Sequence, residues 1–179
     1  MRGRLFANPV AAIARLALLL CLCVTHAHAD ESLEYKIKAA YLYNFTKFIT
    51  WPEKNTASFN ICIVGDDPFQ NLLNSLETKT AFDKPIHVFR YNDVNQAKDC
   101  HIVYFDKTAP RAAMTTQTTG SLTVSSQSSF AESGGMIGFV LEEEKVKLHI
   151  NLRALKQSGL GVSAKLIEVA TLIEGNGHE

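Results

Sequence analysis

Residues whose side chains could carry out chemistry are spread thinly along this 179-residue chain. The acidic pair Asp66-Asp67 follows Gly65 at the end of an apolar run. Two adjacent carboxylates at such a point are of the type that binds Mg²⁺, but no paired lysine or phosphoacceptor aspartate accompanies them. One glycine also makes no phosphate-binding loop. We therefore favour a structural role, in which Asp66 or Asp67 is the N-cap of a helix and Pro68 is its first residue.

The histidines and serines show no catalytic or metal-binding pattern either. Four histidines lie beyond residue 29, none of them three or four residues from another: His87, His101, His149 and His178. This spacing does not support a metal site on a helix. The serines between Ser121 and Ser133 lack the Gly-x-Ser-x-Gly pattern of a nucleophile elbow. The sequence therefore predicts no catalytic residue, no metal and no cofactor, and an enzyme is the least favoured class.

Residues 1–29 have the three parts of a secretory signal peptide. Arg2 and Arg4 give a positive start, a dense apolar run covers Leu16–Val24, and small residues precede the expected cleavage between Ala29 and Asp30. The alternative is a retained membrane anchor, but the apolar run is much shorter than the roughly 20 residues that a spanning helix needs. We expect export to the periplasm and a processed chain that does not span the membrane.

Cysteine usage agrees with export. Cys21 and Cys23 lie in the leader, each preceded by a leucine rather than the small residue typical of lipoproteins, so only Cys62 and Cys100 remain after cleavage. Two cysteines in an oxidising compartment most often pair. Two buried free thiols are the alternative that the sequence leaves open.

The processed chain, residues 30–179, has the length of one domain. The three arginines of the leader leave with it, so 15 basic residues face 18 acidic ones, a net charge of about −3. Because no basic stripe remains, nucleic acid is a poor candidate partner.

Apolar periodicity predicts the order of the elements. Residues 31–49 have apolar side chains every three or four positions, which predicts a helix that ends before Pro52. Short β-rich apolar runs then alternate with helical patterns at 69–76 and 110–118. These runs lie at residues 59–64, 86–91, 100–105 and 122–124. Alternating strands and helices predict an α/β fold with a mainly parallel central sheet and flanking helices.

The commonest five-strand order of such sheets places the first and third strands side by side, which would bring Cys62 close to Cys100. The last third of the chain differs in pattern. Residues 136–141 and 146–150 flank the charged turn 142–144 and predict a β-hairpin. Helical patterns at 152–157 and 163–173 then complete the expected fold with a C-terminal hairpin and helices.

Several segments, taken in order, resemble the YfiR family, and the resemblance spans nearly all of residues 30–179. The segments are Tyr35–Phe45, Phe48–Pro52, Cys62–Phe69, Cys100–Tyr104, Gly134–Ile137, Ile150-Asn151 and Ser158–Leu166. The resemblance implies a periplasmic α/β protein that represses an inner-membrane diguanylate cyclase of the YfiN type by binding its periplasmic region. Cyclic di-GMP and biofilm formation would then stay low. An outer-membrane lipoprotein of the YfiB type is the second partner that the resemblance implies.

The resemblance also implies roles for individual residues. The family's bridge between its first and third strands corresponds to Cys62 and Cys100, whereas a second cysteine pair of some members has no counterpart here. The family's apolar partner-binding surface corresponds to four positions of the C-terminal third: Ile137 on the hairpin, His149 on its second strand, Leu155 after it and Ile173 on the last helix. His149 stands where a characterised relative has an acidic residue.

Three alternatives stay open at this point. Ordinary core packing explains the three apolar positions equally well. A ligand-binding or adaptor module for another membrane sensor, such as a histidine kinase, is the alternative function. A homodimer is compatible with either function.

Overall fold

The computed structural model describes residues 33–110 and 119–174. The predicted leader and nearly all of the helix expected over 110–118 lie outside the described residues. Residues 1–34 and 35–179 form separate units, and the fold described below is that of the second unit.

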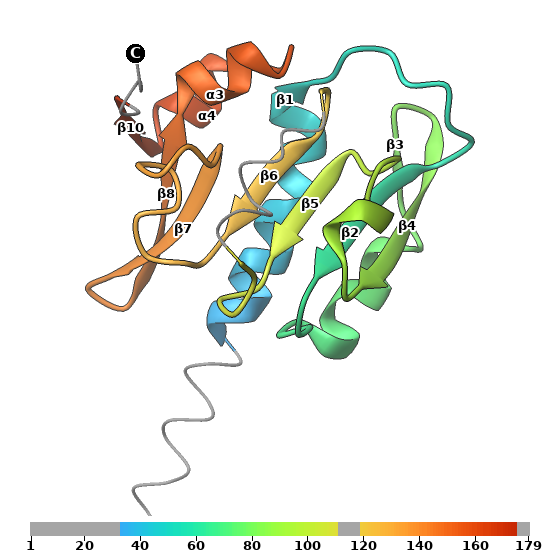
Figure 1. The fold of residues 1–179 in the computed structure, drawn as a ribbon, viewed down its shortest axis with the longest axis horizontal. Helices are drawn as coiled ribbons and strands as arrows, with labels where there is room; N and C mark the ends of the chain where they lie inside the picture. The colour runs from blue at the N-terminus through green and yellow to red at the C-terminus, as the bar shows by residue number, and fades with distance from the viewer. Residues whose placement is uncertain (1–32, 111–118, 175–179) are drawn as a thin grey trace, which may run out of the picture. The chain divides into compact units, whose positions relative to one another are not determined.

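An eight-stranded sheet organises this unit (Figure 1). In sheet order the strands are β10 (Ala170–Ile173), β8 (Lys145–Asn151), β7 (Ile137–Glu142), β6 (Leu122–Ser125), β5 (Ile102–Phe105), β2 (Phe59–Val64), β4 (Lys84–Tyr91) and β3 (Thr80–Ala81). The five neighbouring strands from β7 to β4 run parallel to one another. β3 and β8 are antiparallel to their neighbours in this group, and β10 lies parallel to β8. The predicted mainly parallel α/β sheet and the C-terminal hairpin are both confirmed.

The central strands are buried on both faces, and successive side chains of each strand point alternately to one face and the other. In β2, Ile61 and Ile63 belong to the larger hydrophobic cluster, whereas Cys62 and Val64 belong to a second cluster on the opposite face. We call these the helix face and the disulfide face. The N-terminal helix, which covers residues 33–48, contributes Leu42 and other fully buried side chains to the larger cluster. Figure 1 shows this helix running along one face of the sheet.

Cys62 and Cys100 form a disulfide, with their Cα atoms 6.0 Å apart. Cys62 lies on β2, and Cys100 lies two residues before β5, which pairs with β2 in parallel. The first and third strands of the predicted order are therefore neighbours. Both cysteines are buried in the cluster of the disulfide face, with Val103 and Phe105 of β5.

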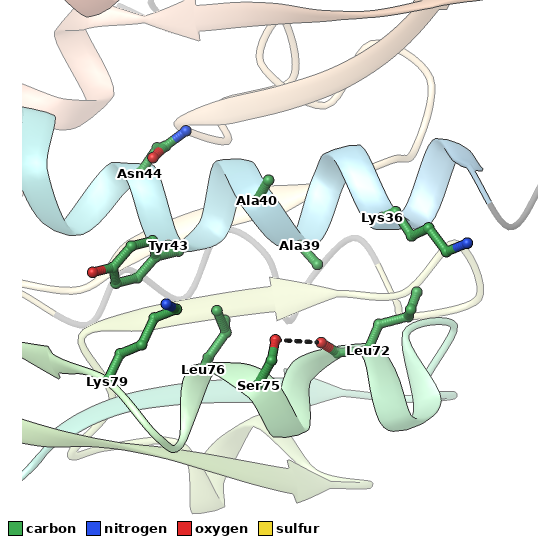
Figure 2. Close-up of a pocket in the computed structure, with 9 residues that line it drawn as sticks. All are labelled: Lys36, Ala39, Ala40, Tyr43, Asn44, Leu72, Ser75, Leu76 and Lys79. Carbon is green, nitrogen blue, oxygen red and sulfur yellow. Dashed lines mark hydrogen bonds between the residues drawn. The ribbon is translucent and has the colours of Figure 1, made fainter.

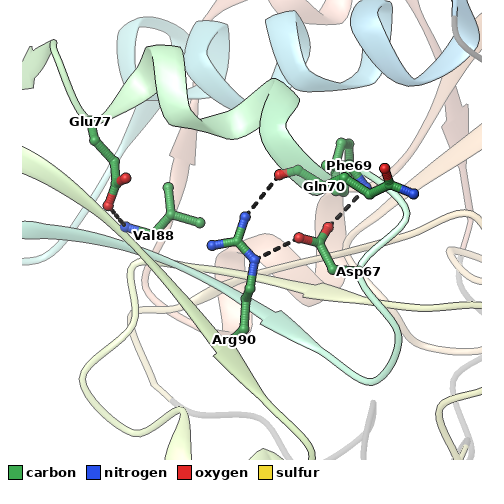
Figure 3. A network of polar contacts seen from close by, with 6 residues as sticks. All are labelled: Asp67, Phe69, Gln70, Glu77, Val88 and Arg90. Atoms are coloured by element: carbon green, nitrogen blue, oxygen red, sulfur yellow. Dashed lines mark hydrogen bonds and ion pairs between the residues drawn. The ribbon is translucent and has the colours of Figure 1, made fainter.

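The helix after β2 differs from the prediction. It is a 3₁₀ helix, η1 (Gln70–Leu76), and no side chain caps its start. The Asp67 carboxylate instead accepts the Phe69 N–H at 2.8 Å and pairs with Arg90 Nε of β4 at 2.6 Å (Figure 3). Arg90 Nη2 also donates to the Gln70 carbonyl at 2.9 Å. Because Arg90 holds this turn from the neighbouring strand and Gln70 has a positive φ of 47°, an α-helix cannot begin at Pro68, and the predicted N-cap is wrong.

The last predicted helix is also wrong beyond its first turn. Ser163 caps a short helix, α4 (Ala164–Ile167), which follows α3 (Leu152–Gln157) and the two-residue strand β9 (Gly161–Val162). The chain then becomes β10, so Ile173 lies on a strand. The edge of β8 offers main-chain hydrogen-bonding groups to these residues, and that pairing outweighs the helical apolar pattern. The other two-residue strand, β1 (Ile49–Thr50), pairs with β9.

The disulfide should contribute a large part of the stability. It links residues 38 positions apart, and a loop of that size restricts the unfolded chain by about 4 kcal/mol in the chain-entropy model. We expect Cys62→Ala combined with Cys100→Ala to lower the free energy of unfolding by about that amount in urea titrations. Reductant should shift the midpoint of the wild type and leave that of the double variant unchanged. Equal wild-type midpoints with and without reductant, after thiol labelling has confirmed reduction, would contradict this expectation.

Candidate functional site

Pairing in the C-terminal strands places three of the four predicted contact residues, His149, Ile173 and Ile137, on two different faces of the sheet. Directly paired residues share a face of the sheet. His149 pairs with Gly138 and Thr171, and Ile173 pairs with Asn151 of the same strand as His149. His149 and Ile173 therefore point to the disulfide face, whereas Ile137, which pairs with Ile150, points to the helix face.

Ile137 and Leu155 lie in the core. Ile137 is fully buried and Leu155 is 1% exposed, and both belong to the larger hydrophobic cluster. Leu155 is placed by α3, which begins where the Asn151 side chain accepts the Ala154 N–H at 3.0 Å. Core packing is the environment of these two side chains, and their contact with a partner stays a prediction.

His149 lies between two carboxylates. Its Nδ1 is 3.0 Å from Glu132 Oε1 and its Nε2 is 3.3 Å from Glu142 Oε1. A neutral imidazole has only one N–H, so both nitrogens donate at once only when the ring is protonated. His149 thus connects the segment before β7 to the end of the hairpin. Sequence reasoning missed the two glutamates because Glu142 approaches His149 only through the register of β7 and β8, and Glu132 only through the path of the turn before β7.

Apolar side chains are exposed along β10, the outermost strand of the sheet, where Ile173 shares the face of His149 and Leu172, which pairs with Ile150, points to the opposite face. Val169 is 61% exposed and Leu172 is 45% exposed, while Ile173 is half-buried. In the part of the chain that the structure describes, no strand pairs with the outer side of β10. Open strand edges are typical sites for pairing with a second chain. We call His149, Val169, Leu172 and Ile173 the edge surface.

A second group of titratable residues lies where β5 and β6 begin. Lys54 Nζ donates to the Cys100 carbonyl at 2.7 Å and to Ser121 Oγ at 2.9 Å. Burial lowers the pKa of Lys54, partly opposed by the charge of Asp99. These hydrogen bonds fix the segment that follows the N-terminal helix onto the start of the strands.

His101 belongs to the same group. Its Nδ1 accepts the Asn60 N–H at 3.0 Å, and its ring stacks on Phe59 with centroids 4.4 Å apart. Burial, followed by the charges of Lys54 and Lys84, lowers the pKa of His101 to about 4. The imidazole therefore stays neutral near pH 7 and serves as a hydrogen-bond acceptor, which is a structural role.

Ligands of parallel α/β sheets usually bind at the carboxyl ends of the strands. Asp106, directly after β5, is the buried carboxylate there. Its Oδ2 accepts the Thr108 N–H at 2.9 Å and the Thr108 hydroxyl at 2.6 Å. Burial raises the pKa of Asp106, but these hydrogen bonds outweigh it and the net pKa is lowered. Asp106 thus closes its own turn, and within residues 33–110 and 119–174 no three His, Cys, Asp or Glu side chains lie together as a metal site would require.

The fold and its polar contacts define an α/β domain whose candidate site is an interaction surface. The family model described as YfiR/HmsC-like matches residues 35–171. The chain therefore belongs to the YfiR/HmsC-like family. No helix within the described ranges is both long and apolar enough to cross a membrane.

The chain is also similar to two solved structures at low sequence identity. One is the ABC domain in complex with L-Trp from Streptococcus pneumonia, with 10% identity, a TM-score of 0.45, and coverage of 64% of this chain and 55% of that one. The other is a conserved domain protein from Vibrio cholerae, with 12% identity, a TM-score of 0.48, and coverage of 63% and 54%. This chain thus spans little more than half the length of either. No curated protein matches it.

Truncation should separate core residues from surface residues. We expect Leu155→Ala to lower the free energy of unfolding by about 2–5 kcal/mol, because it leaves a cavity in the core. His149→Ala should cost about 1 kcal/mol or less, because its ion pairs are partly exposed. Urea titrations of both variants measure the difference. A small loss for Leu155→Ala would show that its side chain is not packed as described.

Acid should destabilise the protein through His101. The unfolded imidazole titrates near pH 6.5 and the folded one near 4, so its contribution is complete above pH 6.5 and is lost as the pH falls towards 4. Between pH 7 and pH 5 this term amounts to about 2 kcal/mol. His101→Asn keeps an acceptor for the Asn60 N–H but does not titrate. Urea titrations at both pH values should show that the wild type loses about 2 kcal/mol more than this variant, and equal losses would refute the assignment.

Proposed function

We propose that the protein is a periplasmic regulator that represses an inner-membrane diguanylate cyclase by binding its periplasmic region, and so lowers cyclic di-GMP and restrains biofilm formation. The observation that carries this proposal is the family match over residues 35–171. The buried Cys62–Cys100 bridge supports an oxidising compartment, as does the predicted leader.

Repression of this kind requires contact and no reaction. A bound protein shifts a conformational equilibrium by its difference in affinity for the two states, and tenfold repression needs about 1.4 kcal/mol. At about 25 cal/mol per Å² of apolar surface, roughly 60 Å² of differential burial provides that energy. The exposed Val169 and Leu172 side chains offer surface of this kind.

The edge surface is the part of the molecule that we assign to the cyclase. It combines exposed apolar side chains, an open strand edge and His149 with its two carboxylates. In this proposal an outer-membrane lipoprotein of the YfiB type competes for the same surface and releases the cyclase. One observation favours the alternative, a ligand-binding module for another sensor: a cavity between the N-terminal helix and η1.

Deletion of the gene should raise cellular cyclic di-GMP, and the wild-type gene should restore the low level. Complementation with Leu172→Asp combined with Ile173→Ala should leave the level near that of the deletion, because charge and lost apolar area weaken contact at the edge surface. Extracted cyclic di-GMP, quantified by mass spectrometry, gives the readout, and thermal unfolding of the purified variant confirms its fold.

Phe82→Asp is the matched control. Phe82 is 55% exposed and lies between β3 and β4, at the opposite end of the strand order from β10. This variant should repress like the wild type. An unchanged cyclic di-GMP level after deletion, in a strain that contains the cyclase, would contradict the proposed function. Full repression by the edge variant would contradict the assigned surface.

A further inference from the structure

A cavity of about 340 Å³ lies between the N-terminal helix and η1. Figure 2 shows the helix along one side of it and η1 along the other, with Ala39 and Tyr43 of the helix facing Leu76 of η1 and Lys79, which follows η1. None of the residues assigned to the edge surface lines it. The cavity is therefore a separate feature of the fold.

The middle of the cavity is mainly apolar, and the hydroxyl of Ser75, which also lines it, donates to the Leu72 carbonyl. The helix contributes Ala39 and Ala40, and η1 contributes Leu72 and Leu76. Alanine side chains end at Cβ, so this part of the helix surface leaves room that a larger side chain would fill. An apolar body can bury itself here at about 25 cal/mol per Å².

The ends of the cavity are positively charged. Lys36 and Lys79 line it together with the Tyr43 ring. Lys79 Nζ is 5.1 Å from the centroid of that ring and Lys47 Nζ is 4.5 Å from it. Two ammonium groups thus share one aromatic ring.

No Asp or Glu lines the cavity. Among the ion pairs of the described residues, none involves Lys36, Lys47 or Lys79. A bound anion would relieve the repulsion between the ammonium groups. The charge of the cavity therefore favours an anionic ligand.

The spacing of the lining residues sets the length of the ligand. Lys36 and Tyr43 are seven residues apart on one helix, which corresponds to about 10 Å along its axis. An extended acyl chain of medium length covers that distance. Its carboxylate would lie near Lys79 and its chain along Ala39 and Ala40.

We propose that this cavity binds a small amphipathic anion, a carboxylate on an unbranched apolar chain of medium length. The proposal stands independently of cyclase repression, because it depends only on the shape and charge of this cavity. A free carboxylate and an acyl lipid in a membrane share this chemistry. The cavity volume fits the free molecule.

Isothermal titration calorimetry with sodium decanoate, below the concentration at which it forms micelles, tests the proposal on the purified protein. We expect saturable binding at one site. Lys79→Gln should weaken it at least tenfold by removing the ammonium group. Ala40→Leu should weaken it similarly by filling the cavity, and Ala40 is exposed, so the fold should tolerate the change. Lys98→Gln, an exposed lysine outside the cavity, is the matched control and should bind like the wild type.

A control ligand and a second measurement make the result decisive. Decanamide, which has the same chain without the charge, should bind at least tenfold more weakly than decanoate. Amide chemical shifts in nuclear magnetic resonance spectra should change at residues 36–44 and 72–79 when decanoate is added. Absence of saturable binding, wild-type affinity in both cavity variants, or binding to phosphatidylglycerol vesicles without binding to decanoate would overturn the proposal.

Discussion

The fold depends on the burial of two adjacent parallel strands, β2 and β5, on both of their faces. Alternate side chains of each strand enter the cluster under the N-terminal helix, and the others surround the Cys62–Cys100 bridge. The disulfide lies in the smaller cluster and so adds a covalent link on the face that has fewer buried apolar side chains. The positions of both candidate sites follow from this arrangement: the cavity lies on the helix face, and the strands that carry the edge surface extend the same sheet at one end.

Elements specified by local pattern could be predicted from the sequence. The run 59–64 became β2 with the same bounds, and Glu143 and Glu144 of the predicted charged turn join the two strands of the hairpin, whereas Glu142 is the last residue of β7. Elements decided by distant contacts could not. The turn before η1 depends on Arg90, 23 residues after Asp67, and residues 170–173 are a strand because β8 presents an edge to them.

The candidate surface could be predicted only in part, for a related reason. The resemblance to the family indicated positions along the chain, but the face to which each side chain points depends on strand register. Register places His149 and Ile173 on one face and turns Ile137 into the core. Glu132 and Glu142 give His149 its electrostatic surroundings, yet in the sequence they are ordinary surface glutamates. The lysines around the cavity were equally inconspicuous, because their convergence requires η1 to lie beside the N-terminal helix.

The N-terminal helix connects the cavity with the hairpin. The N-terminal helix, which carries Tyr43 in the cavity wall, also carries Tyr41 and Phe45, whose rings lie 5.9 Å and 6.1 Å from that of Phe139 on β7. Phe139 pairs with Leu148, the residue before His149. An anion in the cavity would affect partner binding if it favoured one of two positions of this helix over the other. Binding at the edge surface would then change the affinity for the anion by the same factor, since coupling between two sites is reciprocal.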